Sequence, residues 1–521
     1  MSLKKMMKER YAQAHQTSCD KVHFASRLGI PLKKEGDMKR YVNHRRVGWI
    51  VTAAAAFTVV VGVPGAFFLA ASIRVESHSR YDNIRLTLRE AKAIEADHFK
   101  ALNKIEYPAQ EFKREDIPSQ YRDAIVDFSN SLVQGISLKN NTVISPLTAY
   151  ISHDLFSGAA DESTKAIYDE AMGEQVYRNQ GYRPLLRTNF YLDDLGSTQL
   201  YNGMFFNVDH HDTPKQAYVD FLSGRSVEAF EASFRDDRAK FADWINGKVG
   251  EQTVNETAFD DILSEDSMLL GITYLYFNGH WRTPFLKERT MDKVFHLENG
   301  QEELVPFMVH TNYAEYVTTP KSIPAYQGAY EYEGYFSVYD RYAHDYTVQY
   351  LVPKKAEDSI YELLAGKNFL VEDPSAYYFM PRETDQGDDR RMGAYATAIE
   401  FNVPRFATKS IVDLRGALGK TALGKLYSGV QGAGALSEGI DFHDRQIEVS
   451  GLEASKQINS IQFNEDGTIA QSIHFQTPFA AGSAAPMATG LRVTLDQPFV
   501  YVIRDPNGLP MFIGSVSNPK A

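Results

Sequence analysis

Few residues of this chain are arranged as catalytic or metal-binding groups would be. The sequence contains no G-x-S-x-G nucleophile elbow, no H-E-x-x-H zinc motif and no P-loop. The run Asp209-His210-His211-Asp212 has metal-capable side chains, but successive residues point in different directions, so the run favours a surface turn. The segment Gly432-Ala433-Gly434 near Ser437 lacks the strand and helix that frame a phosphate-binding loop. We therefore expect no enzyme, no metal site and no cofactor.

The composition indicates an acidic globular protein with a basic start. The 521 residues are 43% hydrophobic and 23% charged, which allows a large core and excludes a disordered chain. Residues 1–46 carry 12 Lys and Arg against 4 Asp and Glu, whereas the remainder carries 43 against 63. An acidic body disfavours nucleic acid as a partner, because nucleic acid is bound by clustered Lys and Arg. The single cysteine, Cys19, permits no intrachain disulfide.

An uncharged stretch near the N-terminus is long enough to cross a lipid bilayer. Gly48 to Ile73 has 26 residues without a charge, which exceeds the roughly 20 that a spanning helix needs. The alternatives are a cleaved signal peptide, with Ala70-Ala71-Ser72 as its cleavage site, and a buried core helix. The Lys and Arg excess before the stretch favours a single-pass protein of the cell membrane. We expect residues 1–47 to form a basic cytoplasmic tail, residues 48–73 a transmembrane helix, and the remainder to be extracellular.

Residues 74–116 are predicted to form a helical stalk or spacer. They are charged, contain little Gly or Pro, and place apolar residues at approximately helical spacing. A coiled coil is the alternative, although Glu95 interrupts its apolar line. The globular domain is expected over residues 117–521, with helices mainly early and strands mainly late. Its helices are predicted over 117–132, 148–156 and 162–172, and its strands over 198–206, 268–277, 346–352 and 398–403.

The last part of the chain combines a strand, a tight turn and a long loop of small residues. Ile461 and Phe463 alternate with polar neighbours as in a half-buried strand, and Glu465-Asp466-Gly467-Thr468 follows as a turn. Residues 478–490 are rich in Ala, Gly, Ser and Pro without periodicity, which predicts an exposed loop. Two apolar runs, 499–503 and 511–516, are joined through a turn at 505–508, which predicts a hairpin.

These residues resemble the serpin family. The acidic pair followed by Gly-Thr is similar to the serpin hinge, and residues 496–519 are similar to the C-terminal signature of that family. Further family motifs occur in the same order and spacing: Asn141 to Leu147 for N-ϕ-ϕ-ϕ-S-P-ϕ, Ser157-Gly158-Ala159-Ala160 with Ser163-Thr164, Asn278 to Phe285 for G-x-W-x-x-x-F, and Val403-Pro404-Arg405-Phe406 for P-[KR]-F. The resemblance covers about residues 117–519.

The resemblance implies both a fold and a function. The implied fold is α+β, with a large mixed β-sheet, two smaller sheets and about nine helices, preceded by the one transmembrane helix. The implied function is a membrane-anchored inhibitor of serine or cysteine endopeptidases, of bacterial origin. A protease would cut a reactive-centre loop at about 465–494, and the freed hinge would enter the large sheet as an extra strand. The alternatives are a non-inhibitory serpin that acts as a surface binding or structural protein and, more remotely, a membrane-anchored enzyme.

The hinge carried over from the family consists of Glu465, Asp466, Gly467, Thr468, Ala470 and Ser472. After cleavage, residues 468–476 are expected to join the sheet, and Thr468 is expected to enter first. Alternation along a strand would bury every second residue, so His474 and Gln476 would be buried as well and would weaken the drive for insertion. Trp281, from the G-x-W motif, is expected to be both a core residue and part of the region where the sheet opens.

The loop also carries the candidate scissile bond. The family's spacing places it at Ala481-Gly482, and other candidates are Phe479, Ala480, Ala484, Ala485, Met487 and Ala488. No Arg or Lys occurs from Thr468 to Leu491, and a trypsin-like protease needs a basic residue for its acidic pocket. We therefore expect an elastase-like, chymotrypsin-like or subtilisin-like protease as the partner.

Overall fold

The computed structural model divides the chain into two compact units, residues 1–51 and 52–521. All residues that it describes lie in the second unit. They are residues 54–62, 99–249, 254–264, 267–314, 328–373, 397–427, 436–441, 443, 452–468 and 491–520.

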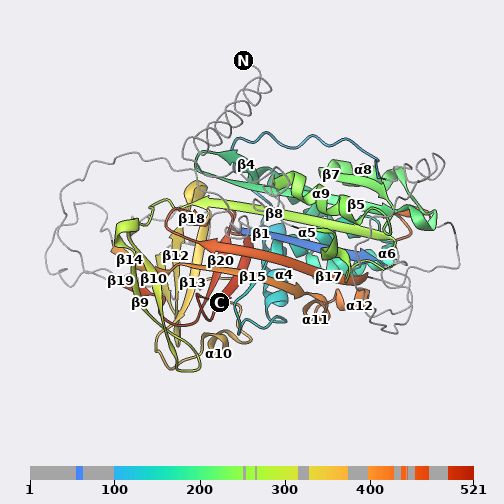
Figure 1. Ribbon diagram of the computed structural model, residues 1–521. Coiled ribbons are helices and arrows are strands. Elements are labelled where there is room, and N and C mark those ends of the chain that lie inside the picture. Colours follow the sequence, from blue (N-terminus) through green and yellow to red (C-terminus); the bar gives the residue numbers. More distant parts are fainter. Residues whose placement is uncertain are drawn as a thin grey trace, which may run out of the picture. The chain divides into compact units, whose positions relative to one another are not determined.

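The largest sheet has nine strands and is mixed (Figure 1). Its main order is β1-β17-β18-β8-β5-β7-β2, while β15 pairs with β17 and β4 pairs with β5. Only the pair of β5 and β7 is parallel among the described pairings of this sheet. The strands are β1 Ala54–Gly62, β2 Lys100–Ala101, β4 Phe190–Asp193, β5 Gly196–Asn207, β7 Val227–Ala232, β8 Leu269–His280, β15 Phe406–Asp413, β17 Leu452–Phe463 and β18 Gly467–Thr468.

Two smaller sheets and a two-stranded ribbon complete the β structure that the structure describes. The six-stranded sheet contains β11 Gly328–Glu331, β12 Tyr335–Arg341, β13 Thr347–Pro353, β20 Phe499–Arg504, β21 Pro510–Val516 and β3 Thr142–Ile144. The four-stranded sheet contains β19 Leu491–Thr494, β14 Thr397–Pro404, β10 Glu302–Ala314 and β9 Met291–His296, and the ribbon contains β16 Ile440–Asp441 and β6 Thr213–Pro214.

Nine α-helices occur among the described residues, in agreement with the number of about nine that the family resemblance implies. They are α4 Ser119–Val133, α5 Pro146–Ser157, α6 Glu162–Met172, α7 Gln175–Thr188, α8 Gln216–Gly224, α9 Arg238–Val249, α10 Ile360–Leu364, α11 Arg415–Leu418 and α12 Gly424–Tyr427. Short 3-10 helices are η1 Val208–His210, η2 Glu256–Phe259, η3 Lys287–Arg289 and η4 Ala343–Asp345. The large mixed sheet, two smaller sheets and nine helices agree with the expected α+β class.

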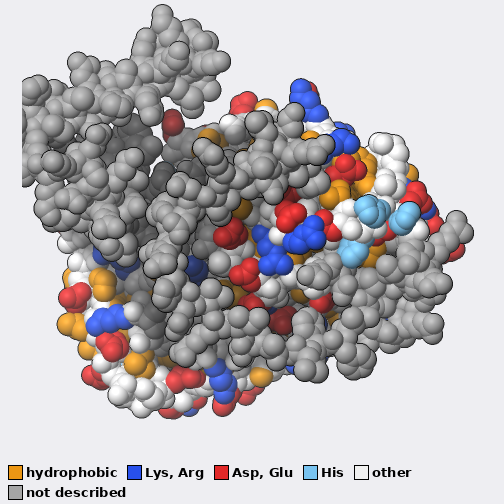
Figure 2. All heavy atoms as spheres, turned by 45° about the vertical axis from the view of Figure 1, so that its right-hand side comes forward, with side chains coloured by type: hydrophobic (Ala, Val, Ile, Leu, Met, Phe, Trp, Pro, Cys, Tyr) orange, Lys and Arg blue, Asp and Glu red, His pale blue; other side chains and the backbone are white. Residues whose placement is uncertain are grey.

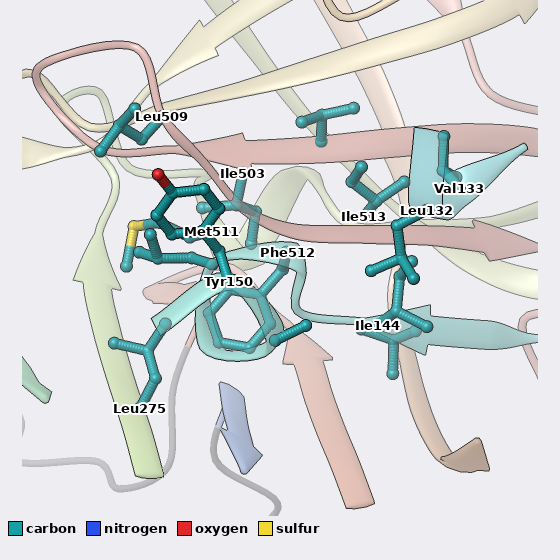
Figure 3. Packing of buried hydrophobic residues seen from close by; sticks show 14 of the residues in the cluster. Leu132, Val133, Ile144, Tyr150, Leu275, Ile503, Leu509, Met511, Phe512 and Ile513 are labelled. Carbon is teal, nitrogen blue, oxygen red and sulfur yellow. The ribbon is translucent and has the colours of Figure 1, made fainter. Parts of the chain in front are cut away.

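Helix α5 lies in the centre of the core. Every one of its residues is buried, and its first turn is capped because the Ser145 side chain accepts from the backbone N–H of Thr148. Tyr150 of this helix packs among Leu275 of β8 and Met511 and Phe512 of β21 (Figure 3). The helix therefore joins the large sheet to the six-stranded sheet through one continuous apolar core.

A buried glutamine ties the start of α5 to the large sheet. Gln457 of β17 accepts from the backbone N–H of Ser145 at 2.9 Å and donates to its carbonyl oxygen at 2.7 Å. Asn459, two residues further along β17, donates to the carbonyl oxygen of Val143 at 2.9 Å. Both amide side chains are fully buried, so these bonds satisfy polar groups beneath the sheet that would otherwise be costly.

The structure differs from the sequence prediction at the N-terminal segments. Residues 48–73 are predicted as a transmembrane helix, but their described part, Ala54–Gly62, forms strand β1 between β8 and β17. Valine and phenylalanine fit a sheet as well as a membrane helix, so the apolar run alone does not distinguish the two. Among the described residues, no helix is both long enough and apolar enough to cross a membrane.

The end of the predicted helical stalk also differs. Residues 99–116 contain no helix and run along the domain, where Lys100–Ala101 pairs with β7. Tyr107 stacks on Phe190 with ring centroids 5.1 Å apart, and Phe112 stacks on His344 at 4.1 Å. The apolar spacing in this segment thus reflects aromatic anchors on the domain surface, and the packed unit begins before residue 117.

A buried histidine predicts how the domain responds to acid. His153 of α5 donates through Nδ1 to the Ala149 carbonyl oxygen at 2.7 Å, so the neutral ring accepts from Tyr427 at Nε2, 2.6 Å away. Burial lowers the pKa of His153 from 6.5 to about 4. Stability from this site is therefore complete above pH 6.5 and is lost as the pH falls toward 4.

We expect a His153→Gln variant to lose less stability than the parent protein between pH 6.5 and pH 4, by on the order of 2 kcal/mol. Urea unfolding at a series of pH values measures this difference. The matched control is His443→Gln, the same substitution at an exposed histidine. Equal pH slopes for the parent and the His153 variant would contradict the assignment.

Candidate functional site

The candidate site is the turn that connects β17 to β18. Strand β17 alternates buried and partly exposed residues up to Phe463, and Asn464 then closes the turn. The Asn464 side-chain oxygen accepts from the backbone N–H of Asp466 at 3.0 Å and of Gly467 at 3.1 Å. No sequence motif singles out Asn464, although asparagine is a common turn residue for this reason.

Gly467 allows the chain to return into the sheet. It pairs with His280 of β8, and a Cβ atom at this position would lie 2.2 Å from the Gly279 carbonyl oxygen. That distance is far below any real contact, so only glycine fits here. This close approach gives a physical reason for the Gly-Thr pair in the predicted hinge.

Glu465 anchors the turn with a buried carboxylate. Its exposed fraction is 3%, and its Oε1 accepts from Thr290 Oγ1 at 2.8 Å and from Arg405 Nη2. Burial alone raises the pKa of Glu465, but the hydrogen bonds from Arg405 and Thr290 outweigh burial and leave the pKa below its ordinary value. Asp466, by contrast, is more exposed and forms an ion pair with Lys287 at 2.8 Å.

Trp281 packs directly beneath this turn. Its indole Nε1 donates to the Asn464 carbonyl oxygen at 2.8 Å, and its ring stacks on Tyr342 with centroids 4.4 Å apart. Phe285 contacts the same ring edge-on at 5.4 Å. Trp281 is 3% exposed and is thus a core residue that also contacts the hinge.

Thr468 is already part of the sheet in the uncut chain. It pairs with Gly279 of β8 on one side and with Phe463 of β17 on the other, and it is completely buried. Its hydroxyl lies 2.6 Å from that of Tyr342. The expectation that Thr468 enters the sheet only after cleavage is therefore corrected. No sequence signal set Tyr342 apart as its partner.

The far end of the loop is held in a different sheet. Residues 469–490, which connect β18 to β19, number 22. Strand β19 runs parallel to β14, with Leu491 opposite Ile399, and Arg492 forms an ion pair with Glu400 at 2.7 Å. The remaining predicted site residues lie outside the described residues: Ala470, Ser472, Phe479, Ala480, Ala481, Gly482, Ala484, Ala485, Met487 and Ala488.

Strand β1 lies between β8 and β17, past the end of β18 (Figure 1). It runs antiparallel to both strands, with Ala55 opposite Tyr276 of β8 and Ser460 of β17. In the part of the chain that the structure describes, β8 and β17 do not pair with each other, and both pair with β18 and β1.

The Asp209-His210-His211-Asp212 run forms a turn, as its sequence indicates. His side chains gather on one exposed face among acidic and basic side chains (Figure 2). Asp209 accepts from Ser233 Oγ at 3.1 Å, and Asp212 accepts from the backbone N–H of His443 at 2.8 Å. Within the described ranges, no group of three or more His, Cys, Asp or Glu side chains is arranged to hold a metal ion.

Comparison with known proteins gives a consistent result. The family profile described as "Serpin (serine protease inhibitor)" matches residues 123–519. Similar curated proteins include plasminogen activator inhibitor 1 of Mus musculus, 26% identical over 54% of this chain and 62% of that protein, and alaserpin of Manduca sexta, 27% identical over 58% and 65%. The chain thus spans less than two thirds of these two relatives. Alpha-1-antitrypsin of Sus scrofa is 22% identical over 76% of this chain and 86% of that protein.

Solved structures show the same fold. The thermophilic serpin tengpin in its native state superimposes with a TM-score of 0.60 at 19% identity, over 80% of this chain and all of that chain. Human thyroxine-binding globulin in its thyroxine complex gives a TM-score of 0.54 at 16% identity, over 77% and 100%. At these identities the likeness extends to the fold alone, and a bacterial source stays a prediction.

The contacts of Glu465 predict the effect of removing its partner. An Arg405→Leu change leaves the buried carboxylate with one hydrogen bond fewer and no countercharge, so we expect a loss of about 2 kcal/mol in the free energy of unfolding at pH 7. The loss should shrink as the pH falls below 4.5, where an ordinary Glu becomes protonated. Urea unfolding at pH 7 and at a pH below 4.5 measures this loss in the free energy of unfolding.

The matched control is Arg282→Leu, because Arg282 pairs with Asp345 at 3.4 Å while both side chains are more than half exposed. An exposed pair of this kind contributes at most about 1 kcal/mol. Equal losses for the two variants would contradict the anchoring role of Glu465.

Proposed function

Because the chain belongs to the serpin family, we propose that it is a membrane-anchored inhibitor of serine or cysteine endopeptidases rather than an enzyme. The observation that carries this proposal is strand β18, which places Thr468 between β8 and β17 before any cleavage. The loop that a protease would cut therefore begins as a strand that can be extended.

The two ends of the loop lie in different sheets, which determines what cleavage releases. Thr468 is held in the nine-stranded sheet and Leu491 in the four-stranded sheet. After a cut between them, the residues that follow Thr468 are covalently connected to the domain through β18 and no longer through β19. These residues can then continue β18 along β8 and β17, provided that the space between the two strands is open.

Extension of β18 supplies the energy for trapping. Each added ladder hydrogen bond contributes about 0.5 to 1.5 kcal/mol net, so ten bonds would release on the order of 10 kcal/mol. During cleavage the protease is joined to the loop as an acyl-enzyme, and insertion of the loop drags the protease with it. A displacement of about 1 Å in a catalytic triad is enough to stall deacylation.

The loop sequence determines the class of target. The absence of Arg and Lys from Thr468 to Leu491 disfavours trypsin-like proteases. The candidate residues Phe479, Ala481 and Met487 instead suit the apolar pockets of chymotrypsin-like, elastase-like and subtilisin-like enzymes.

The proposal includes a single-pass anchor in the cell membrane. Its support is the uncharged run of residues 48–73 and the excess of Lys and Arg before it. With the N-terminus in the cytoplasm, the inhibitory domain would be presented outside the cell, where secreted proteases act.

A non-inhibitory serpin is the second candidate function. The observation that favours it is strand β1, which fills the space into which the loop would extend. A serpin whose sheet is permanently filled would keep the fold but could not trap a protease, and it would act as a surface binding or structural protein.

We expect the full-length chain in lipid nanodiscs to form a covalent adduct that survives a denaturing gel when it is incubated with chymotrypsin-like, elastase-like or subtilisin-like proteases. Mass spectrometry of the released C-terminal fragment should place the cut after a residue between 479 and 487. Cleavage without an adduct for every protease in the panel would contradict inhibition and favour the second candidate.

The insertion step is tested by a pair of neighbouring substitutions. Residue 470 would share the buried face of Thr468 once it is inserted, whereas residue 471 would face outward. We expect Ala470→Arg to be cut without forming an adduct, because insertion would bury an unpaired charge at a cost of several kcal/mol. Gln471→Arg is the matched control and should still form the adduct. Adduct formation by both variants would contradict strand insertion.

The topology is tested by labelling Cys19, the single cysteine, in intact cells that express the full chain. An impermeant thiol reagent should not label Cys19, whereas it should label a Cys19→Ser, Ser79→Cys control, because residue 79 follows the span. External labelling of Cys19 would contradict a cytoplasmic N-terminus.

A further inference from the structure

Strand β1 occupies the register that the cleaved loop would need. Strand β18 places Thr468 opposite Gly279 of β8 and opposite Phe463 of β17. Continued residue by residue along β8, the loop would place residue 470 opposite Phe277 and residue 478 opposite Leu269. In the structure these two positions are the partners of Ala54 and Gly62, the first and last residues of β1.

The pairing with β17 gives the same result independently. Continued along β17, residue 471 would lie opposite Ser460, which is the partner of Ala55. Strand β1 also runs in the direction of β18, because both are antiparallel to β8 and β17. Residues 54–62 therefore occupy the positions that residues 470–478 would take after insertion. They pair with β8 on one side and with β17 on the other.

The residues of β1 suit this place better than those of the loop. Ala56, Thr58 and Val60 lie opposite Asn459, Gln457 and Ser455, whose side chains are all completely buried. Directly paired residues share a face of a sheet, so small or apolar residues are favoured at these three positions. The loop would bring Ser472, His474 and Gln476 to the same positions. Burial of each of the two larger polar groups without a partner costs about 1 to 3 kcal/mol.

The Gln457 amide and the Asn459 NH2 group beneath β1 have partners of their own. The Gln457 amide bonds the backbone of Ser145, and Asn459 donates to the Val143 carbonyl oxygen. These partners belong to β3 and to the start of α5, so they remain whichever strand lies between β8 and β17. These hydrogen bonds are therefore kept when an apolar segment closes the sheet.

We infer that residues 54–62 are an internal occupant of the insertion site and regulate the protein by competing with its own reactive loop. The inference rests on the proposed inhibitory function. The same residues are the middle of the uncharged run that can enter a bilayer, and one segment cannot be in both places. In the bilayer the segment leaves the site open for the loop. Outside the bilayer it fills the site, and a protease cuts the loop without being trapped.

A reversible crosslink tests this inference on the full chain in a Cys19→Ser background. Thr58 lies opposite Thr273 of β8. The Cα atoms of such antiparallel partners are about 4.5 to 5.5 Å apart, which suits a disulfide. The control pair is Thr58→Cys with Thr408→Cys, since Thr408 lies on β15, separated from β1 by β17. Mild oxidation in detergent solution should crosslink the Thr58→Cys, Thr273→Cys protein and leave the control uncrosslinked.

The crosslinked protein should then be cut by the protease panel with complete loss of the covalent adduct. Reduction and transfer into lipid nanodiscs should restore adduct formation. A crosslinked chain that still traps protease would overturn the inference and leave the proposed function intact, and failure of the Thr58–Thr273 pair to crosslink would overturn it as well. If the crosslink forms but the reduced protein in nanodiscs traps no protease, the proposed inhibition fails, while occupation of the site by 54–62 is upheld.

Discussion

The space between β8 and β17 can hold only one strand, and the behaviour of the whole domain depends on which strand that is. Each of the two strands offers a single free edge toward the other. Strand β18 pairs with residues 279–280 of β8 and with Phe463 of β17. Strand β1 pairs with residues 269–277 of β8 and with residues 452–460 of β17. Backbone N–H and C=O groups in a sheet are satisfied by one neighbour on each side, so a second segment can enter only when β1 leaves. The sheet can therefore be continuous in two ways, with either β1 or the inserted loop hydrogen-bonded between β8 and β17.

The hinge above this space is fixed by groups from three separate parts of the chain. Glu465 is held by Arg405 and Thr290, and Trp281 holds the Asn464 carbonyl oxygen from below. These contacts keep Thr468 in the sheet without occupying the positions below it. Strand β18 is thus stabilised independently of the segment that follows it between β8 and β17. This independence allows either β1 or the loop to occupy that space.

Much of the domain was predictable because local pattern and packing agree. The helix over Glu162–Met172 was predicted at its observed bounds, and β5, β8, β13, β14 and the β20–β21 hairpin were predicted within a few residues. Glu465, Gly467 and Trp281 were identified from motifs, and the structure supplies their physical roles. Tyr342 was missed because its importance depends on a hydroxyl that meets Thr468 across 126 positions of sequence. The apolar content of Ala54–Gly62 does not distinguish a lipid environment from the middle of a sheet, and aromatic anchors such as Tyr107 do not reveal their partners.

The most direct test of this account is hydrogen exchange of the β8 backbone, Leu269–Phe277, in the full chain. We expect strong protection of these amides outside a bilayer with no further gain on loop cleavage. In lipid nanodiscs we expect weak protection of the amides that face β17, and a large gain in protection once the loop is cut. Equal protection in both environments, before and after cleavage, would contradict the claim that one space is shared by two strands.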